Sequence, residues 1–132
     1  DHDRDTVTLP GVRVLLSSTA GAGHFNPLVP VLEALARRND EVLIAIPPRL
    51  EATVRATGND FRIGAEPPKA ELAPLWARCT TLAHAQAPFI IERGLFGRLC
   101  TAAMLPTVDP ACREWLPDLV LASQRATDLR LQ

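Results

Sequence analysis

The sequence has 132 residues, of which 47% are hydrophobic and 22% charged, and its formal net charge at pH 7 is −1. This length accommodates one domain at most, and the hydrophobic content is typical of a globular chain. A net charge near zero gives no electrostatic basis for binding nucleic acid or an anionic membrane. No apolar run approaches the roughly 18 residues that a membrane span needs. We therefore expect neither nucleic acid nor a membrane as a partner.

The N-terminal residues and the cysteines predict a cytoplasmic location. Residues 1–10 are charged or small, without periodicity, and are interpreted as an unrelated leader. They begin with Asp1-His2-Asp3, the opposite of a signal peptide's basic start. Cys79, Cys100 and Cys112 are an odd number without metal-ligand spacing, which favours reduced thiols.

The first predicted elements are a strand, a glycine turn and a helix. The strand covers about Val12 to Ser18, and the turn is Gly21-Ala22-Gly23. A helix is predicted from about Pro27 to Arg38, with Asn26 as its N-cap. Pro30 lies where the first intrahelical hydrogen bond would be donated, so the first turn is expected to be irregular.

Two further strands follow at short intervals. Asn39 tolerates the left-handed conformation and is expected to end the first helix. Glu41 to Ile46 is predicted as a strand buried on both faces, as in a parallel sheet. A short helix from Arg49 to Thr57, closed by Gly58, then leads to a third strand over Asp60 to Ile63.

From about Lys69 to Trp115 the pattern is helical, and prolines are expected to divide it into pieces. These prolines are Pro74, Pro88, Pro106 and Pro110. A last strand is predicted from Asp118 to Ala122, and residues 123–132 are interpreted as an unrelated tail. The resulting order, β-α-β-α-β-helices-β, predicts an α/β fold with a doubly wound parallel sheet over residues 11–122.

The segment Ser17 to Pro27 is the most informative, because it places His24 after a strand, where ligands gather in open α/β sheets. A dinucleotide-binding turn is one interpretation, but Asn26 stands at the third glycine position and Pro47-Pro48-Arg49 replaces the ribose-binding acid. A phosphate-binding loop lacks its Gly-Lys-Ser/Thr. A solvated histidine without a chemical role is the third interpretation.

A fourth interpretation comes from Gly23-His24-Phe25-Asn26-Pro27 followed by apolar residues at helical spacing, including Leu28 and Leu32. This pattern resembles the N-terminal, acceptor-binding domain of GT-B-type glycosyltransferases, of the UDP-glycosyltransferase-like kind that glycosylates natural products in bacteria. The resemblance continues through Glu41 to Pro47 and Ala56 to Gly58, and it resumes from Trp115 to Leu121. It covers about residues 11 to 121.

The resemblance implies a Rossmann-like sheet, the truncated N-terminal half of a GT-B enzyme. It implies transfer of a sugar from a nucleotide-sugar donor to a hydroxyl of a hydrophobic natural-product acceptor, as in antibiotic biosynthesis. His24 matches the family's catalytic base, which takes the acceptor's proton. Gly23, Phe25 and Asn26 beside it are predicted to contact the substrate. No metal or other cofactor is expected, since the sequence offers no ligand cluster.

The family's base is usually paired with an acid that orients it and stabilises its cation. That acid follows the strand matching Leu119 to Leu121, and Ser123 stands at the matching position. Asp118 begins the same strand, at the opposite edge of the sheet from His24. Asp128 lies in the tail, which matches nothing. The partner acid is therefore predicted to be missing.

In such domains the helices after the third strand line the acceptor pocket. Four apolar residues are candidates for its wall: Trp76, Phe89, Phe96 and Met104. The alternative is that they are core residues, since apolar side chains at helical spacing usually are.

The resemblance also implies a second domain that holds the donor, to which nothing in this sequence corresponds. The chain alone is therefore expected to be inactive. The alternative to an enzyme part is a non-catalytic module of the same fold that binds a small molecule or a partner. A sheet of four strands with an open edge also predicts self-association.

Overall fold

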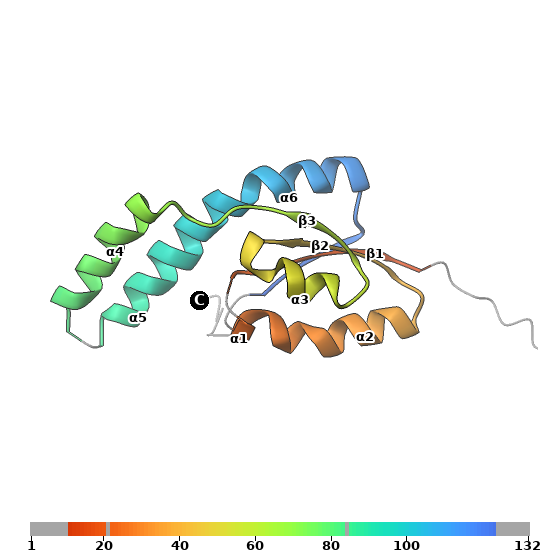
Figure 1. Cartoon of the computed structure of the whole chain (residues 1–132), viewed down its shortest axis with the longest axis horizontal. Coiled ribbons are helices and arrows are strands. Elements are labelled where there is room, and N and C mark those ends of the chain that lie inside the picture. The colour runs from red at the N-terminus through yellow and green to blue at the C-terminus, as the bar shows by residue number, and fades with distance from the viewer. Residues whose placement is uncertain (1–10, 21, 84, 124–132) are drawn as a thin grey trace, which may run out of the picture.

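The structure is a computed structural model that describes residues 11–20, 22–83 and 85–123. The predicted leader, residues 1–10, lies outside the described residues, as does all of the predicted tail except Ser123. Four strands form one parallel sheet in the order β3-β2-β1-β4 (Figure 1). The predicted doubly wound parallel sheet is confirmed.

The strands lie within one residue of their predicted bounds. They are β1 (Arg13–Ser17), β2 (Glu41–Ile46), β3 (Asp60–Ile63) and β4 (Leu119–Ala122). β1 is central and pairs in parallel with both β2 and β4. Leu16 of β1 lies opposite Ile44 of β2 on one side and Leu121 of β4 on the other. β4 is an edge strand, and Leu119 and Val120 in it are 48% and 47% exposed.

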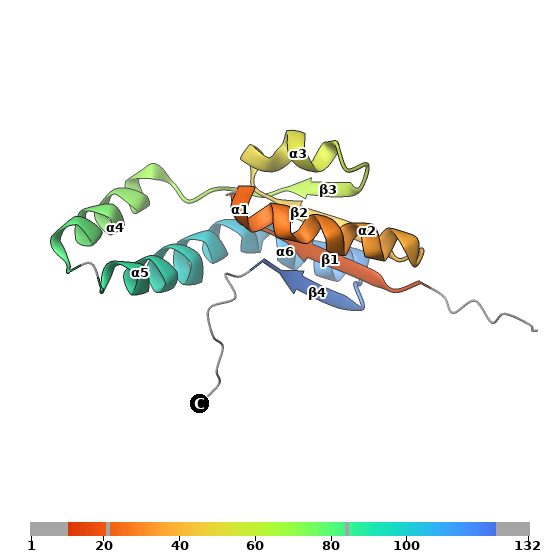
Figure 2. The ribbon, with the colours of Figure 1, turned by 90° about the horizontal axis from the view of Figure 1, so that it is seen from below.

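Each face of the sheet is covered by helices, so the molecule has three layers (Figures 1 and 2). Strand side chains alternate between the faces, which gives two hydrophobic clusters. The first lies under the helices that follow β1 and β2, and consists of Leu16, Phe25, Leu32, Ile44, Ile46, Leu50 and Val54. The second lies under the last helix, and consists of Leu15, Leu43, Ala45, Met104 and Ala111.

The predicted start of the first helix is wrong. Helical structure begins at α1 (Ala22–Phe25), continues through the 3₁₀ turn η1 (Asn26–Leu28) and becomes α2 (Val29–Arg37). Asn26 is the first residue of η1 and caps nothing. The prolines at 27 and 30 lack the N–H that a continuous helix needs, and each occupies the start of its own segment, where none is required. The predicted irregular first turn is confirmed.

The second crossover is the 3₁₀ turn η2 (Pro48–Leu50) followed by α3 (Glu51–Arg55). The two predicted helix ends are confirmed in their backbone geometry, since Asn39 has φ 59° and Gly58 has φ 75°. Both values lie in the left-handed region. Each of these residues lets the chain reverse into the strand that follows.

The long helical region is a hairpin that extends beyond the sheet (Figure 1). Its first arm is α4 (Lys69–Thr81), and its second is α5 (Ala87–Ile90), the π-helical segment η3 (Ile91–Cys100) and α6 (Thr101–Trp115). The part of α6 from Met104 onward packs on the sheet.

The prediction that prolines divide this region is wrong at three of the four sites. Pro74 lies inside α4, and Pro106 and Pro110 lie inside α6. Each removes one hydrogen bond to the carbonyl four residues earlier. Those carbonyls belong to exposed residues, including Ala70 and Ala102, where water can replace the missing donor. Pro88 alone stands at a helix start.

Among the described residues, no helix combines the length and the apolar character needed to cross a bilayer.

Replacing Asn39 tests the left-handed helix end. Asn39→Ala should lower the free energy of unfolding by about 1 kcal/mol, because alanine is strained at positive φ. Asn39→Gly should leave the free energy of unfolding within a few tenths of a kcal/mol of that of the parent protein. Urea denaturation of the three proteins measures the difference. Equal stability of the alanine and glycine variants would contradict the assignment.

Candidate functional site

A pocket opens where β1 and β4 end, facing the π-helical segment η3. Its cavity volume is about 510 Å³. Three groups of residues line it: the chain after β1 with α1, the end of β4, and one face of η3 and α6. The described residues that line it are Ser17, Ser18, Thr19, His24, Glu92, Arg93, Phe96, Gly97, Cys100, Thr101, Met104, Ala122 and Ser123.

Parallel pairing brings the two strand ends together. The Ser123 N–H donates to the Ser17 carbonyl at 2.8 Å, which extends the β1–β4 ladder past the last residue of β4. The Ser123 hydroxyl donates to Ser18 Oγ at 3.1 Å, and Ser18 in turn donates to the Thr19 carbonyl at 3.0 Å. Thr19 Oγ1 is buried and has no hydrogen-bond partner among the described residues. The floor of the pocket is therefore a row of hydroxyl groups.

His24 reaches this pocket from α1. Its imidazole and the ring of Phe96 lie with their centroids 5.1 Å apart and their planes at 60°, an edge contact between aromatic rings. His24 is half-buried. The structure thus places the predicted base in a cavity at the carboxyl ends of the strands.

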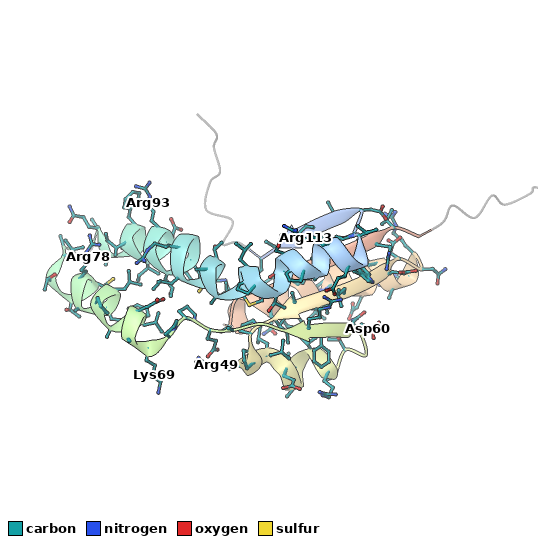
Figure 3. The ribbon with its side chains drawn as sticks, turned by 90° about the horizontal axis from the view of Figure 1, so that it is seen from above. Arg49, Asp60, Lys69, Arg78, Arg93 and Arg113 are labelled. Carbon is teal, nitrogen blue, oxygen red and sulfur yellow. The ribbon has the colours of Figure 1, made fainter. Side chains whose placement is uncertain are left out.

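Two of the four residues predicted to form the apolar wall line the pocket, and two do not. Phe96 and Met104 line the pocket, and Met104 also packs in the second hydrophobic cluster. Trp76 and Phe89 do not line it and are 44% and 57% exposed. Both lie on the part of the hairpin that extends beyond the sheet. The guanidinium of Arg93, which points outward in Figure 3, lies 5.3 Å from the Phe89 ring centroid.

The three residues that flank His24 in the sequence motif are not among the described pocket-lining residues. Phe25 is fully buried in the first hydrophobic cluster, so the structure places it in the core and not, as predicted, at the acceptor. Asn26 is exposed on η1. Gly23 is exposed too, and a Cβ built on it would meet nothing within 4 Å. The helical periodicity of α1 explains this, because neighbouring residues of a helix face different directions.

The structure describes two of the three residues that were considered for the position of the acid that would pair with His24. Ser123 lies in the pocket, as the matching position predicts. Asp118 lies at the opposite edge of the sheet, where its Oδ2 accepts the Arg13 N–H at 2.8 Å. Asp128 lies outside the described residues. Glu92 is the carboxylate among the described residues that line the pocket, and it was not predicted as a site residue.

Helical spacing could have identified Glu92 and its neighbours. The lining residues of the second arm recur every three or four positions, from Glu92 through Phe96 and Cys100 to Met104. Residues at this spacing share one face of a helix. Phe96 and Met104 were predicted from this segment, but Glu92 was not, because only apolar residues were considered for the pocket wall.

Cys100 lines the pocket but is a poor nucleophile. Burial raises the pKa of its thiol above the ordinary value, and the negative charge of Glu66 raises it further. Its thiolate fraction at neutral pH is therefore smaller than that of an ordinary cysteine. All three cysteines are free, as predicted. Across the described ranges, no group of three or more His, Cys, Asp or Glu side chains is placed to hold a metal ion.

No protein-family model and no curated protein matches the sequence. Solved structures match over most of the chain. The glycosyltransferase SsfS6 of Streptomyces sp. SF2575 matches with a TM-score of 0.66 and 27% identity, over 84% of this chain and 33% of its own. The calicheamicin glycosyltransferase CalG4 matches with a TM-score of 0.59 and 20% identity, over 86% and 27%. The kitacinnamycin glycosyltransferase matches with a TM-score of 0.59 and 18% identity, over 86% and 25%.

The chain has the fold of a GT-B glycosyltransferase. This agrees with the family that the residues around His24 resemble. The glycosyltransferase-like chain spans between a quarter and a third of the length of the structures it matches.

The pH dependence of alkylation tests the environment of Cys100. Iodoacetamide reacts with the thiolate, so modification of Cys100 should reach half its maximum rate at a higher pH than modification of free cysteine. Peptide mapping by mass spectrometry separates Cys100 from Cys79 and Cys112. Glu66→Gln removes the smaller of the two causes and should move the midpoint down, though not as far as that of free cysteine.

Arg49→Gln is the matched control, because Arg49 pairs with Glu66 at 3.1 Å and its loss leaves the carboxylate in place. It should not lower the midpoint. A midpoint in the parent protein at or below that of free cysteine would contradict the assignment.

Proposed function

We propose that this chain is the acceptor-binding part of a glycosyltransferase that moves a sugar from a nucleotide-sugar donor to a hydroxyl of a hydrophobic natural product. The observation that carries the proposal is the position of His24, which lies in a pocket at the carboxyl ends of β1 and β4. In open α/β sheets this is where ligands bind. The fold of the chain agrees with this chemistry.

His24 is the proposed base. The imidazole takes the proton of the acceptor hydroxyl as the oxygen attacks the anomeric carbon of the sugar. The new bond joins that oxygen to the anomeric carbon, and the bond that breaks joins the same carbon to an oxygen of the donor's phosphate. The nucleotide leaves with the bonding electrons, and the proton stays on His24. The resemblance implies that a second domain holds the donor.

The proposed acceptor combines an apolar body with hydroxyl groups. The cavity volume of about 510 Å³ lies within the usual range for small-molecule sites. Phe96 and Met104 offer apolar surface, while Ser123 at the end of β4 offers a hydroxyl. Two of the matched enzymes are named for natural products, kitacinnamycin and calicheamicin, which supports an acceptor of that chemical kind.

Protection of Cys100 tests acceptor binding without any need for catalysis. A bound acceptor covers the pocket, so a panel of hydroxylated aromatic compounds should slow iodoacetamide modification of Cys100 in a saturable way. Cys79 on α4 is not among the lining residues and is the internal control. Met104→Ala should weaken the protection about tenfold, since it removes buried apolar contacts. Trp76→Ala should leave it unchanged. Equal protection of both cysteines, or protection by no compound, would count against the pocket.

A transfer assay tests the catalytic part of the proposal. The purified chain, nucleotide-sugars and the same acceptors should yield no glycoside, because the expected donor domain has no counterpart in the described residues. Liquid chromatography with mass detection follows the products. Turnover by the parent chain that disappears in His24→Ala would overturn the expected inactivity and support the base. Turnover that survives in His24→Ala would refute the base assignment.

A further inference from the structure

His24 must be held in one orientation if its imidazole is to act as the base. An imidazole on a side chain with two rotatable bonds must be held in one direction to act on one proton. In enzymes with a triad, a carboxylate holds it. Here Ser123 stands where that acid is expected, and within the described part of the chain His24 makes no hydrogen bond or ion pair. Its contact is the ring of Phe96, at 5.1 Å between centroids.

We propose that Phe96 is the positioning residue for His24, and that its ring fixes the direction of the imidazole through the edge contact. The proposal deepens the proposed function and rests on it for its catalytic meaning. Perpendicular aromatic pairs are favoured because the positive edge of one ring meets the negative face of the other. The contact is directional, so it selects one rotamer of His24 over those that leave Phe96 uncovered.

Phe96 can position another ring because its own segment is held on several sides. Its carbonyl accepts the Thr101 hydroxyl at 3.0 Å, a bond that spans five residues. Leu99, three residues further along η3, is 3% exposed. On the other arm of the hairpin, Leu75 approaches Gly94 so closely that a Cβ there would lie 2.5 Å from Leu75 Cδ1. The close packing of α4 on η3 and the buried Leu99 leave the backbone at Phe96 little freedom.

The same ring lines the acceptor pocket, so one residue contacts both the base and the proposed acceptor site. An acceptor that packs on Phe96 is held beside the imidazole by the group that orients it. Phe96 therefore links the fit of the acceptor to the direction of the base.

Nuclear magnetic resonance of the 132-residue chain tests the contact directly. The sequence has three histidines, so labelled histidine gives three sets of imidazole signals, and His24→Gln assigns one set. We expect nuclear Overhauser effects between the imidazole protons of His24 and the ring protons of Phe96. In Phe96→Leu, the imidazole signals of His24 should move toward those of free histidine, and its χ1 couplings should become averaged.

Two variants make the result specific. Phe96→Tyr keeps an aromatic ring and should restore the imidazole shifts and the single χ1 rotamer. Phe89→Leu removes an exposed ring of the same helical arm and should change neither. Unchanged His24 shifts and couplings in folded Phe96→Leu would overturn the proposal. If that variant does not fold, absence of the Overhauser effects in the parent protein would overturn it.

The experiment is independent of the proposed function. Failure of every acceptor to protect Cys100 would remove the acceptor site and leave the ring contact intact. If the contact between His24 and Phe96 were absent but acceptors still protected Cys100, only the positioning role of Phe96 would be refuted.

Discussion

The parallel pairing of β1 with β4 is the constraint on which the site depends. These strands are separated by about a hundred residues, and their ladder ends with the Ser123 N–H on the Ser17 carbonyl. A shift of one residue in this register would turn the side chains of β4 to the other face of the sheet. Ser123 would then leave Ser18, and the hydroxyl floor of the pocket would be divided. The chain can form the pocket only after this long loop has closed, so the site is a product of tertiary structure and not of the local motif.

The second constraint is the continuous helical arm from α5 to α6. It joins two environments, because its C-terminal half packs on the sheet through Met104 and Ala111, while its N-terminal half extends beyond the sheet beside α4. Residues along one continuous helical arm keep fixed positions relative to one another. Met104 packs in the core, and Phe96, eight residues earlier on the same arm, lines the pocket and contacts His24. Each proline inside α6 removes a hydrogen bond to the carbonyl of an exposed residue, where water can replace the missing donor.

Local patterns predicted the sheet better than they predicted the site. Buried strands such as Glu41–Ile46 are short, apolar and bounded by turn residues, so the local sequence pattern was enough to predict where they begin and end. The predicted helix start was wrong because Asn26 and Pro27 form an acceptable local N-terminus, whereas helical structure begins at Ala22 and buries Phe25 in the core. His24 could be chosen because its motif is local. Glu92 shares a helical face with Phe96 and Met104, but the meeting of that face with the end of β1 depends on how the hairpin folds back, which no single segment encodes.

A base oriented by an apolar ring differs chemically from one paired with an acid. An aromatic edge contact contributes about 0.5–1.5 kcal/mol, which corresponds to a preference of roughly 2-fold to 12-fold for one orientation. An adjacent carboxylate would also stabilise the protonated imidazole by direct charge, and Phe96 supplies no such charge. An acid usually both orients the imidazole and stabilises its positive charge. In the proposed site, Phe96 provides the orientation only. Among the other groups that line the pocket, Glu92 carries a charge opposite to that of a protonated imidazole, and the serine and threonine hydroxyls carry dipoles.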